Sequence, residues 1–345
     1  MQRRIYFSRL VLLGCLTVVL SFGLQAQDFK TQHFPEEGYL QAWNFTFRSD
    51  RHNLFATFLV SNFGPGSHNN GISLLLKTKD QPVFYSTREF DSEEYEFKKG
   101  QFYQRSGDNW MEYKNGIYSF YMNYGDREIK LDYKPRRGSV PISNGKFPLV
   151  EKGKFVQADI PFSYSTVTGT IRYKDVIEEV KGVGGLEHIL TNEAVYQYSK
   201  KWEIVRSQTK DGYRIFTGGF IGNSNFPGEY FRRVAVLNPS GSLVLEGTVE
   251  KVEVLEWEKE PTSGYTIPKT EILTFGNGSC QLSVKRTRPI ATMSALENIS
   301  SFLRFFIQLF FAKPYQIHWI AELKLNCPEY SGEGKGYHSN YLINE

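Results

Sequence analysis

Apolar and polar residues alternate with a period of two along most of this 345-residue chain. The clearest examples cover residues 43–47, 72–76 and 118–124, in which every second residue is large and apolar. Successive side chains of a β-strand point to opposite faces, so this pattern is typical of strands that are buried on one face. Asn115-Gly116, just before the third example, predicts a tight hairpin turn. Many short strands joined by such turns predict an all-β fold, either a sandwich or a barrel.

The second half of the chain repeats this pattern. Alternating segments at residues 213–221, 231–237 and 317–327 predict further strands. Aromatic residues make up 15% of the chain, which suits pleated and half-buried strands better than helices. Residues 134–154 are rich in proline and glycine and predict a long surface loop. The length of the chain is ample for two domains.

Residues 1–26 have the three parts of a secretory signal peptide. Arg3 and Arg4 are followed by an apolar run, and Ala26 provides a small residue for cleavage. The sequence therefore predicts an exported protein, periplasmic or secreted. Residues 12–15, Leu-Leu-Gly-Cys, resemble a lipoprotein cleavage site, but the chain after Cys15 stays apolar, so lipid anchoring there is the less favoured alternative. Retention as a membrane anchor is less favoured still.

Cleavage of the signal peptide changes the charge balance, because it removes Arg3, Arg4 and Arg9. The full chain has 41 basic and 37 acidic residues, so 38 basic residues (41 minus 3) remain beside 37 acidic ones. Nucleic-acid binding requires a strongly basic surface. A nearly neutral mature chain therefore indicates no nucleic-acid partner.

Two cysteines remain after cleavage, Cys280 and Cys327. Each lies on the apolar face of an alternating segment, so two inward-facing cysteines on paired strands could meet. An even number of cysteines in an oxidising compartment favours a disulfide. Two unpaired buried thiols are the alternative.

Residues 290–313 differ in pattern from the rest of the chain. Apolar residues recur there at helical spacing, and Pro289 and Pro314 lie on either side. This predicts one amphipathic helix, inserted in the C-terminal domain and packed over a barrel mouth. The apolar run is too short and too polar to span a bilayer, so the alternative is peripheral contact with a membrane surface.

Several motifs carry a resemblance to a known family. They are Trp43-x-Phe45-x-Phe47, the strand and turn at 54–64, the run at 167–173 that leads into Gly182-Val-Gly-Gly-Leu-Glu-His188, and a related glycine-rich phrase at 332–340. With these motifs the chain resembles the lipocalin-like superfamily that includes carotenoid 1,2-hydratases (hydroxyneurosporene synthases), AttH-like proteins and the fungal survival-factor proteins. Trp202, about one strand after His188, also suits the family pattern, whereas Leu186 stands where an aromatic residue is common.

The resemblance implies two consecutive lipocalin-like (calycin-type) antiparallel β-barrels, at 27–185 and 186–345. It also implies an apolar barrel cavity for a hydrophobic small molecule or lipid. Burial of such a ligand yields roughly 25 cal/mol per Å² of apolar surface. No cofactor follows from the resemblance or from the motifs.

Glu187 and His188 are the candidate catalytic residues. A carboxylic acid in an apolar pocket has a raised pKa and can protonate an alkene or enol near neutral pH. A neighbouring histidine could hold or relay the proton. Consecutive strand residues face opposite sides, so only one of the two need line a cavity. In the structural alternative, one residue supports the glycine-rich connection and the other lies at the domain interface.

The candidate ligand-binding residues are aromatic or polar and lie in or near the same motifs; they are Trp43, Trp202, Tyr337, His338 and Asn340. His318 falls on the polar side of the strand at 317–327 and is expected to be exposed. The histidines are scattered along the chain and the two cysteines are assigned to a disulfide. No metal site is therefore predicted.

Three functions remain open at this stage. The first is binding of a hydrophobic small molecule or lipid. The second is a hydratase or isomerase-type enzyme that acts on an isoprenoid-like substrate, with Glu187 as the proton donor. The third is a β-sandwich that binds carbohydrate or protein through an exposed platform of tyrosine and tryptophan.

Overall fold

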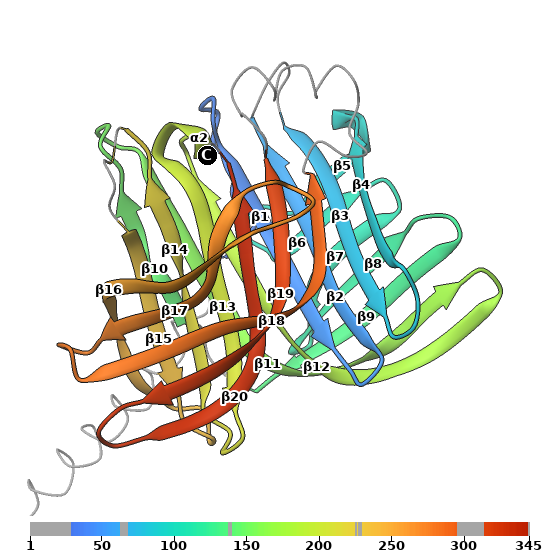
Figure 1. Ribbon diagram of the computed structural model, residues 1–345. Helices are drawn as coiled ribbons and strands as arrows, with labels where there is room; N and C mark the ends of the chain where they lie inside the picture. The colour runs from blue at the N-terminus through green and yellow to red at the C-terminus, as the bar shows by residue number, and fades with distance from the viewer. Residues whose placement is uncertain are drawn as a thin grey trace, which may run out of the picture.

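The computed structural model describes residues 29–62, 68–136, 140–224, 226, 230–294 and 314–343. Most of these residues belong to antiparallel strands, and the strands form two sheets that lie side by side (Figure 1). The N-terminal sheet is nearly closed, and the C-terminal sheet closes into an eight-stranded barrel. The predicted all-β class with two successive barrel-like units is confirmed.

The N-terminal sheet has twelve strands in the order β4-β3-β2-β1-β12-β11-β9-β8-β7-β6-β5, with β10 paired to β11. A long hairpin of β11 and β12 turns at Lys174, whose φ is 52°. β12 continues past residue 185, so the expected domain boundary falls within this strand. The strands of this sheet are β1 Leu40–Arg48, β2 His52–Ser61, β3 Asn69–Thr78, β4 Val83–Phe90, β5 Tyr95–Phe97, β6 Tyr103–Ser106, β7 Asn109–Lys114, β8 Ile117–Asn123, β9 Arg127–Pro135, β10 Val140–Pro148, β11 Phe155–Tyr173 and β12 Val176–Thr191.

The C-terminal barrel follows a short helix, α2 (Val195–Tyr198), and runs in simple sequential order from β13 to β20. β20 pairs with β13 and closes the barrel. Gly336 of β20 permits this closure, because a Cβ at this position would lie 2.0 Å from the carbonyl oxygen of Arg206. The barrel strands are β13 Ser199–Thr209, β14 Arg214–Gly222, β15 Tyr230–Leu237, β16 Leu243–Lys259, β17 Thr266–Phe275, β18 Cys280–Ser294, β19 Tyr315–Asn326 and β20 Ser331–Leu342.

Aromatic side chains fill the interior of the N-terminal sheet. Phe45, Phe120 and Tyr133 are fully buried. The ring centroid of Phe45 lies 5.0 Å from that of Phe120 and 5.2 Å from that of Tyr133, which is the ordinary spacing of packed aromatic rings. The alternation that predicted these strands therefore serves to pack a core.

Apolar side chains fill one end of the C-terminal barrel. Val205, Leu273 and Leu282 are fully buried in this cluster. Cys280 and Cys327 belong to the same cluster and form a disulfide between the start of β18 and the end of β19. The predicted disulfide is confirmed.

A separate apolar interface joins the two sheets. Ile142 of β10 packs in one cluster with Trp202 and Phe220, which project from the outer face of the barrel. A second cluster joins Phe55 of β2 to Tyr337 of β20. In Figure 1 the blue strands β1 and β2 accordingly lie beside the red strands β19 and β20. The two units thus share a buried boundary rather than a loose linker.

Two expectations about local structure are wrong. The expected loop at 134–154 contains β10, which pairs with β11 and buries Val140 and Ile142 at the interface, so tertiary packing outweighs its local composition. The helix expected from residue 290 is strand up to Ser294, because bulges beside Arg286 and Pro289 allow β18 to continue along β19.

Parts of two other predictions cannot be compared with this fold. Residues 1–28, with the expected signal peptide, and residues 295–313, with the rest of the expected helix, lie outside the described residues. Within the described ranges, no helix has the length and apolar character needed to cross a membrane.

Candidate functional site

An apolar cavity of about 260 Å³ lies between the N-terminal sheet and the barrel. Leu59 of β2 and Ile189 of β12 line one side, and Trp202 and Ile204 of β13 line the other. Strand alternation explains why Trp202 and Ile204 reach the cavity. They lie on the outer face of β13, whereas Val205, the residue after Ile204, faces the interior of the barrel. The cavity therefore lies between the two sheets, whereas the prediction placed it inside a barrel.

A second cavity of about 340 Å³ adjoins the first. The two cavities share Ile142, Ala158, Trp202 and Gly219 in their linings. The indole Nε1 of Trp202 is buried and has no hydrogen-bond partner among the described residues. The side chain of Trp202 thus contributes to the lining of both cavities.

Glu187 of β12 lines the first cavity and is held by an ion pair. Both of its carboxylate oxygens accept hydrogen bonds from the guanidinium of Arg206, and Asn44 Nδ2 donates to Oε2 at 2.9 Å. The side chains of Glu187 and Arg206 are only 12% and 7% exposed. A fork-to-fork pair of this kind stabilises the ionised carboxylate. In this structure the geometry favours a charge-bearing or proton-accepting Glu187 over a proton donor.

His188 also borders the apolar cavity, but its ring packs in the core of the N-terminal sheet. Its ring centroid lies 5.7 Å from that of Trp43. Gln41 Nε2 lies 2.9 Å from His188 Nε2, and Asp159 Oδ2 lies 3.4 Å from Nδ1. If the Gln41 amide donates, the proton of the imidazole is on Nδ1, facing Asp159. Glu187 and His188 are therefore on opposite faces of β12 and do not form a dyad.

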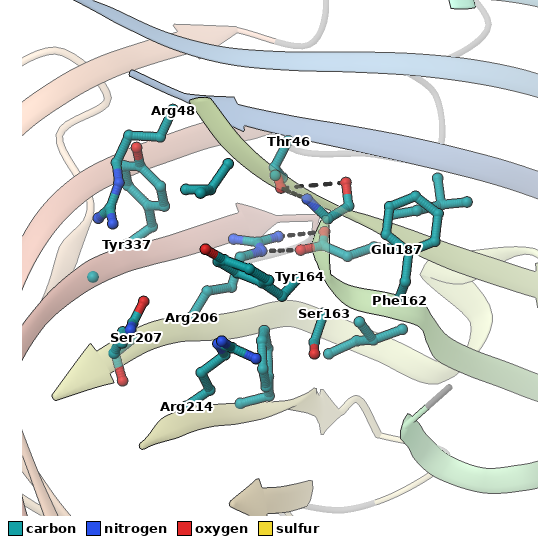
Figure 2. A pocket seen from close by; sticks show the side chains of 18 of the residues that line it. Thr46, Arg48, Phe162, Ser163, Tyr164, Glu187, Arg206, Ser207, Arg214 and Tyr337 are labelled. Atoms are coloured by element: carbon teal, nitrogen blue, oxygen red, sulfur yellow. Dashed lines mark hydrogen bonds and ion pairs between the residues drawn. The ribbon is translucent and has the colours of Figure 1, made fainter. Parts of the chain in front are cut away.

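A smaller cavity of about 90 Å³ is also lined by Glu187 and has a basic character (Figure 2). Arg206 and Arg214 line it, and each is only 7% exposed. Ser163 and Tyr164 reach it from β11, which has a bulge on each side of Phe162. Such bulges redirect side chains, and here they turn Ser163 and Tyr164 toward the barrel.

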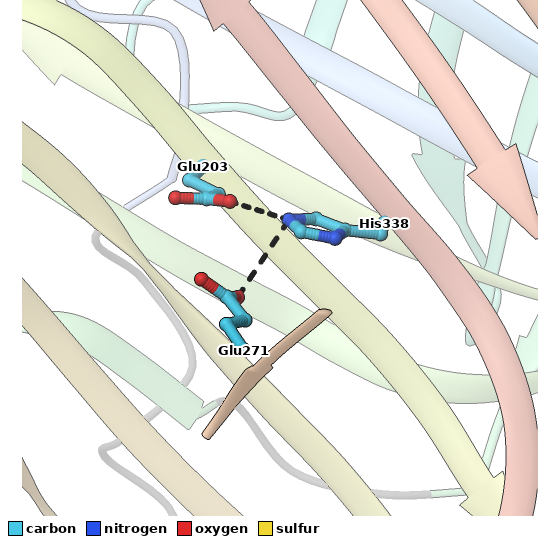
Figure 3. Close-up of side chains that lie close together, drawn as sticks. All are labelled: Glu203, Glu271 and His338. Atoms are coloured by element: carbon cyan, nitrogen blue, oxygen red, sulfur yellow. Dashed lines mark hydrogen bonds and ion pairs between the residues drawn. The ribbon is translucent and has the colours of Figure 1, made fainter. Parts of the chain in front are cut away.

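The interior of the barrel contains a cluster of buried ionisable side chains (Figure 3). His338 Nε2 lies 2.5 Å from Glu203 Oε1 and 3.9 Å from Glu271 Oε1. Arg232 Nη2 donates to Glu271 Oε1 at 3.2 Å, and Arg286 Nε donates to His338 Nδ1 at 3.2 Å. These five residues come from five different strands of the barrel.

Burial and neighbouring charges set the protonation of this cluster. Burial, supported by Arg286, lowers the pKa of His338 to about 3. Burial acts to raise the pKa of Glu203, but the positive charges of Arg232 and Lys201 outweigh it and hold that pKa well below its usual range. Burial and the charge of Glu203 raise the pKa of Glu271. The cluster thus has a neutral histidine beside an ionised Glu203.

Glu203, Glu271 and His338 have the composition of a metal site, but their surroundings do not suit a divalent cation. A metal-bound histidine normally donates its second ring N–H to an acceptor. Here Nδ1 of His338 accepts a hydrogen bond from Arg286, so Nε2 carries the proton and donates to Glu203. Two buried guanidinium groups also lie beside the carboxylates and already balance their charge.

The structure places the other candidate residues in three different environments. Trp43 is fully buried in the N-terminal core, where its Nε1 donates to the Phe29 carbonyl at 2.8 Å. Tyr337 lines the basic cavity and donates to Asn53 across the interface. Asn340 is buried, and its backbone lies opposite that of Glu203 in the pairing of β20 with β13. Of the predicted ligand-binding residues, Trp202 and Tyr337 are the ones that line the inter-sheet cavities described above.

The expectation that His318 is exposed is wrong, since it is only 1% exposed. Its ring stacks on Phe55 with a centroid distance of 4.5 Å, and its Nδ1 lies 2.9 Å from Ser339 Oγ. The face of β19 that the sequence marks as polar is covered by the N-terminal sheet rather than by water. Alternation within one strand cannot show that covering.

Sequence reasoning missed Arg206 and Arg214 at the interface and the charged residues inside the barrel. A signal for the latter was present, because Arg232, Glu271 and Arg286 each lie two residues from a buried apolar side chain of the same strand. A charge on the apolar face of an alternating strand indicates a buried partner of opposite charge. Arg214 also lies two residues from a buried apolar side chain, Phe216, but alternation within one strand does not show that the faces of Arg206 and Arg214 become buried where the sheets meet.

Comparison with known proteins identifies the fold. A scan against protein-family models and a search of curated proteins find no match. Among solved structures, an AttH-like protein from Nitrosomonas europaea matches with a TM-score of 0.62 at 12% identity, covering 92% of this chain and 98% of that one. CghA matches with a TM-score of 0.60 at 10% identity, covering 93% and 98% of the two chains. Kievitone hydratase from Nectria haematococca matches with a TM-score of 0.58 at 11% identity, covering 89% and 90%.

These three structures extend over nearly the whole chain, so the similarity includes both sheets and their arrangement. The resemblance inferred from the sequence motifs is thereby confirmed at the level of the fold. At 10–12% identity the similarity shows the fold alone.

Proposed function

We propose that this protein binds a hydrophobic small molecule or lipid in the apolar cavity between its two sheets. The observation that carries the proposal is the cavity itself, which is lined by apolar side chains of both sheets and has the Trp202 indole at its boundary. Ligand sites typically combine such a lining with a few polar groups that fix the orientation of the ligand.

Two further observations support this function. The adjoining cavity shares Trp202 and Ala158, so the apolar lining extends beyond the first cavity. One of the solved structures of the same fold is CghA with Sch210972, so this architecture can hold a small molecule. That molecule is a ligand of CghA, and it identifies no ligand for this chain.

Retinol is a suitable probe, because it is an apolar isoprenoid and quenches tryptophan emission by energy transfer. We expect saturable quenching with the wild-type protein. Ala158→Leu extends a side chain into both cavities and should weaken binding at least about tenfold, since it fills space that the ligand needs. Trp257→Ala is the matched control, because Trp257 is 55% exposed. Equal affinity of wild type and Ala158→Leu for retinol would exclude this cavity as the binding site. In a separate experiment, native mass spectrometry of the purified protein, with solvent extraction, should show a retained apolar ligand.

A hydratase or isomerase-type reaction on an isoprenoid-like substrate is the second candidate function. Glu187 reaches the apolar cavity, and kievitone hydratase shares the fold. For Glu187 to donate a proton, a substrate would first have to separate it from Arg206. Turnover of a candidate isoprenoid should collapse in Glu187→Gln while its affinity persists, and unchanged turnover would remove Glu187 from the mechanism.

The third possibility was a β-sandwich that binds carbohydrate or protein. The barrel architecture contradicts the sandwich fold on which that possibility depends. Export of the protein remains part of the proposal. The disulfide between Cys280 and Cys327 suits an oxidising compartment such as the periplasm or the cell exterior. N-terminal sequencing of the mature protein should begin at Gln27, and a lipid-modified Cys15 at the N-terminus would contradict cleavage after Ala26.

A further inference from the structure

The interior of the C-terminal barrel contains buried polar atoms that have no hydrogen-bond partner among the described residues. Their side chains lie on the inward faces of seven of the eight barrel strands. These atoms are Glu203 Oε2, Thr217 Oγ1, Arg232 Nε and Nη1, Glu271 Oε2, Arg286 Nη1 and Nη2, Trp319 Nε1, and Asn340 Nδ2 and Oδ1. Buried polar atoms are nearly always paired in folded proteins, so such a concentration indicates partners that the chain itself does not supply.

These side chains form one polar layer across the barrel. Figure 3 shows Glu203, Glu271 and His338 pointing toward one another. The backbone of Asn340 lies opposite that of Glu203, where β20 meets β13. Arg232 Nη1 lies 3.7 Å from Glu203 Oε2, which is close enough for an ion pair but too far for a hydrogen bond. The unpaired atoms are therefore neighbours rather than isolated defects.

Apolar side chains lie on both sides of this polar layer. Two residues after Glu203, Val205 belongs to the buried apolar cluster at one end of the barrel. Two residues after Asn340, Leu342 belongs to a separate buried cluster in the direction of the other end. Glu203 and Asn340 are only 1% and 0% exposed. The layer is thus enclosed, and bulk solvent does not reach its unpaired atoms.

The barrel interior also has a surplus of positive charge. Burial acts to raise the pKa of Glu203, but the charges of Arg232 and Lys201 hold that pKa well below its usual range, so Lys201 acts on the polar layer. Lys201 is only 3% exposed, and with Arg232 and Arg286 it makes three buried cations. The buried carboxylates are those of Glu203 and Glu271, so the formal charge is +1 (3 minus 2). A buried charge without a partner is costly, and an anion would remove the surplus.

Donors also outnumber acceptors among the unpaired atoms of the layer. Arg232 and Arg286 each have two unpaired nitrogens, and Trp319 Nε1 and Asn340 Nδ2 are further donors. The unpaired acceptors are one oxygen of each glutamate and the amide oxygen of Asn340. A guanidinium group presents its N–H groups in a planar fork that matches the oxygens of a carboxylate or a similar planar anion. The layer therefore lacks a negatively charged group that is rich in acceptor oxygens.

We infer that the interior of the C-terminal barrel binds a small monovalent oxyanion beside Arg232, Arg286 and Asn340. The interior of an eight-stranded barrel is filled by its side chains or holds one small ligand, so formate, acetate and nitrate are anions of suitable size. This site is separate from the proposed ligand site, because it lies on the inward faces of the barrel strands, whereas the apolar cavity lies against the outward face of β13. The bound anion stabilises the folded barrel.

Urea unfolding in different sodium salts tests this inference. The protein is unfolded and refolded in formate, acetate, nitrate or chloride at constant ionic strength, so that an enclosed anion can exchange. We expect at least one of the three oxyanions to raise the urea midpoint above that in chloride, with a saturable dependence on its concentration. At about ten times the dissociation constant, and with a slope of about 2 kcal/mol per molar urea, the midpoint should rise by about 0.7 M.

Variants assign the effect to the polar layer. Arg286→Met removes a buried cation and should weaken binding of the effective oxyanion about tenfold or more. Asn340→Leu keeps the side-chain volume and should weaken binding about fivefold, so it keeps the test valid if Arg286→Met does not fold. Lys251→Gln is the matched control for loss of one positive charge, because the Lys251 side chain lies on β16 of the same barrel and is 67% exposed. It should leave the anion effect unchanged.

Three outcomes would overturn the inference. If none of the oxyanions raises the midpoint above that in chloride, internal water supplies the missing partners. If the anion effect is the same in wild type, Arg286→Met and Asn340→Leu, the anion binds elsewhere. If Lys251→Gln reduces the effect as much as Asn340→Leu does, the effect is a general response to salt. Retinol binding tests the proposed function separately, because none of these variants changes the apolar cavity.

Discussion

The disulfide between Cys280 and Cys327 should stabilise the C-terminal barrel by a large amount. The two cysteines are 47 residues apart in sequence and join the start of β18 to the end of β19. A cross-link restricts the unfolded chain, and for a loop of this length the chain-entropy relation gives about 4 kcal/mol at 25 °C. The native strands already hold the two residues together, so the bond needs no further ordering of the folded state.

Urea unfolding with and without reductant measures this contribution. With a slope of about 2 kcal/mol per molar urea, a loss of about 4 kcal/mol lowers the unfolding midpoint by about 2 M. The wild-type protein should be reduced in denaturant and refolded with reductant, because both sulfur atoms are buried. Trp202 and Trp319 report unfolding of the barrel through their fluorescence.

The double variant Cys280→Ala/Cys327→Ala separates the cross-link from packing. It should be less stable than the oxidised wild type, and reductant should leave its midpoint unchanged. Reduced wild type and the double variant should then differ only by the small packing contribution of the two thiols. A reductant effect of the same size in the double variant, or none in the wild type, would refute the loop-entropy reasoning.

Three further predictions concern the core and the interface. Glu203→Gln should destabilise the barrel by about 3–5 kcal/mol in chemical unfolding, because it removes the ionised carboxylate beside the buried Arg232 and Arg286 and leaves Glu271 as their remaining acidic neighbour; a change below about 1 kcal/mol would contradict the assigned ion network. Burial, with the charge of Arg206, lowers the pKa of His318 to about 3. Between about pH 6.5 and pH 3 the unfolded chain therefore binds a proton at this histidine that the folded chain does not bind, so the stability should fall as the pH is lowered through this range. Urea midpoints measured at several pH values should show a less steep fall in His318→Gln. Gly336→Ala should lower the free energy of unfolding by about 1–3 kcal/mol, because the added Cβ would collide with the carbonyl oxygen of Arg206. Gly247→Ala is the control, because a Cβ there meets open space, and it should change the free energy of unfolding by less than about 0.5 kcal/mol. Equal effects of the two variants would show that the close approach of the strands at Gly336 is unimportant.

Local sequence patterns determined much of the fold. Alternation at 43–47 and 118–124 predicted strands that the structure contains as β1 and β8, because burial on one face imposes a period of two. Asn115 and Gly116 have φ values of 53° and 82°, the conformation that their residue types favour in a hairpin turn. The two cysteines lie in one apolar cluster, as their positions in alternating segments indicated.

Local pattern failed where the partner of a segment lies far away in the sequence. β10 has a loop-like composition, yet it forms a strand because β11 pairs with it and the barrel covers it. His318 lies on the polar side of its strand in the sequence pattern, yet its ring is covered by Phe55 of the other sheet. In both cases the covering surface comes from another element, which the segment itself does not encode.

The candidate site shows the same division between sequence and tertiary structure. The sequence singled out Glu187 and Trp202 through motifs, and by itself it determined an all-β chain with two barrel-like units and one inward-facing cysteine pair. Only the packing of one sheet against the other decided that Glu187 pairs with Arg206, that Trp202 lines cavities between the sheets, and that Arg214 is buried. The physical reason is that alternation specifies which side chains share a face, whereas the environment of the outer face depends on a second surface that reaches it through tertiary contacts.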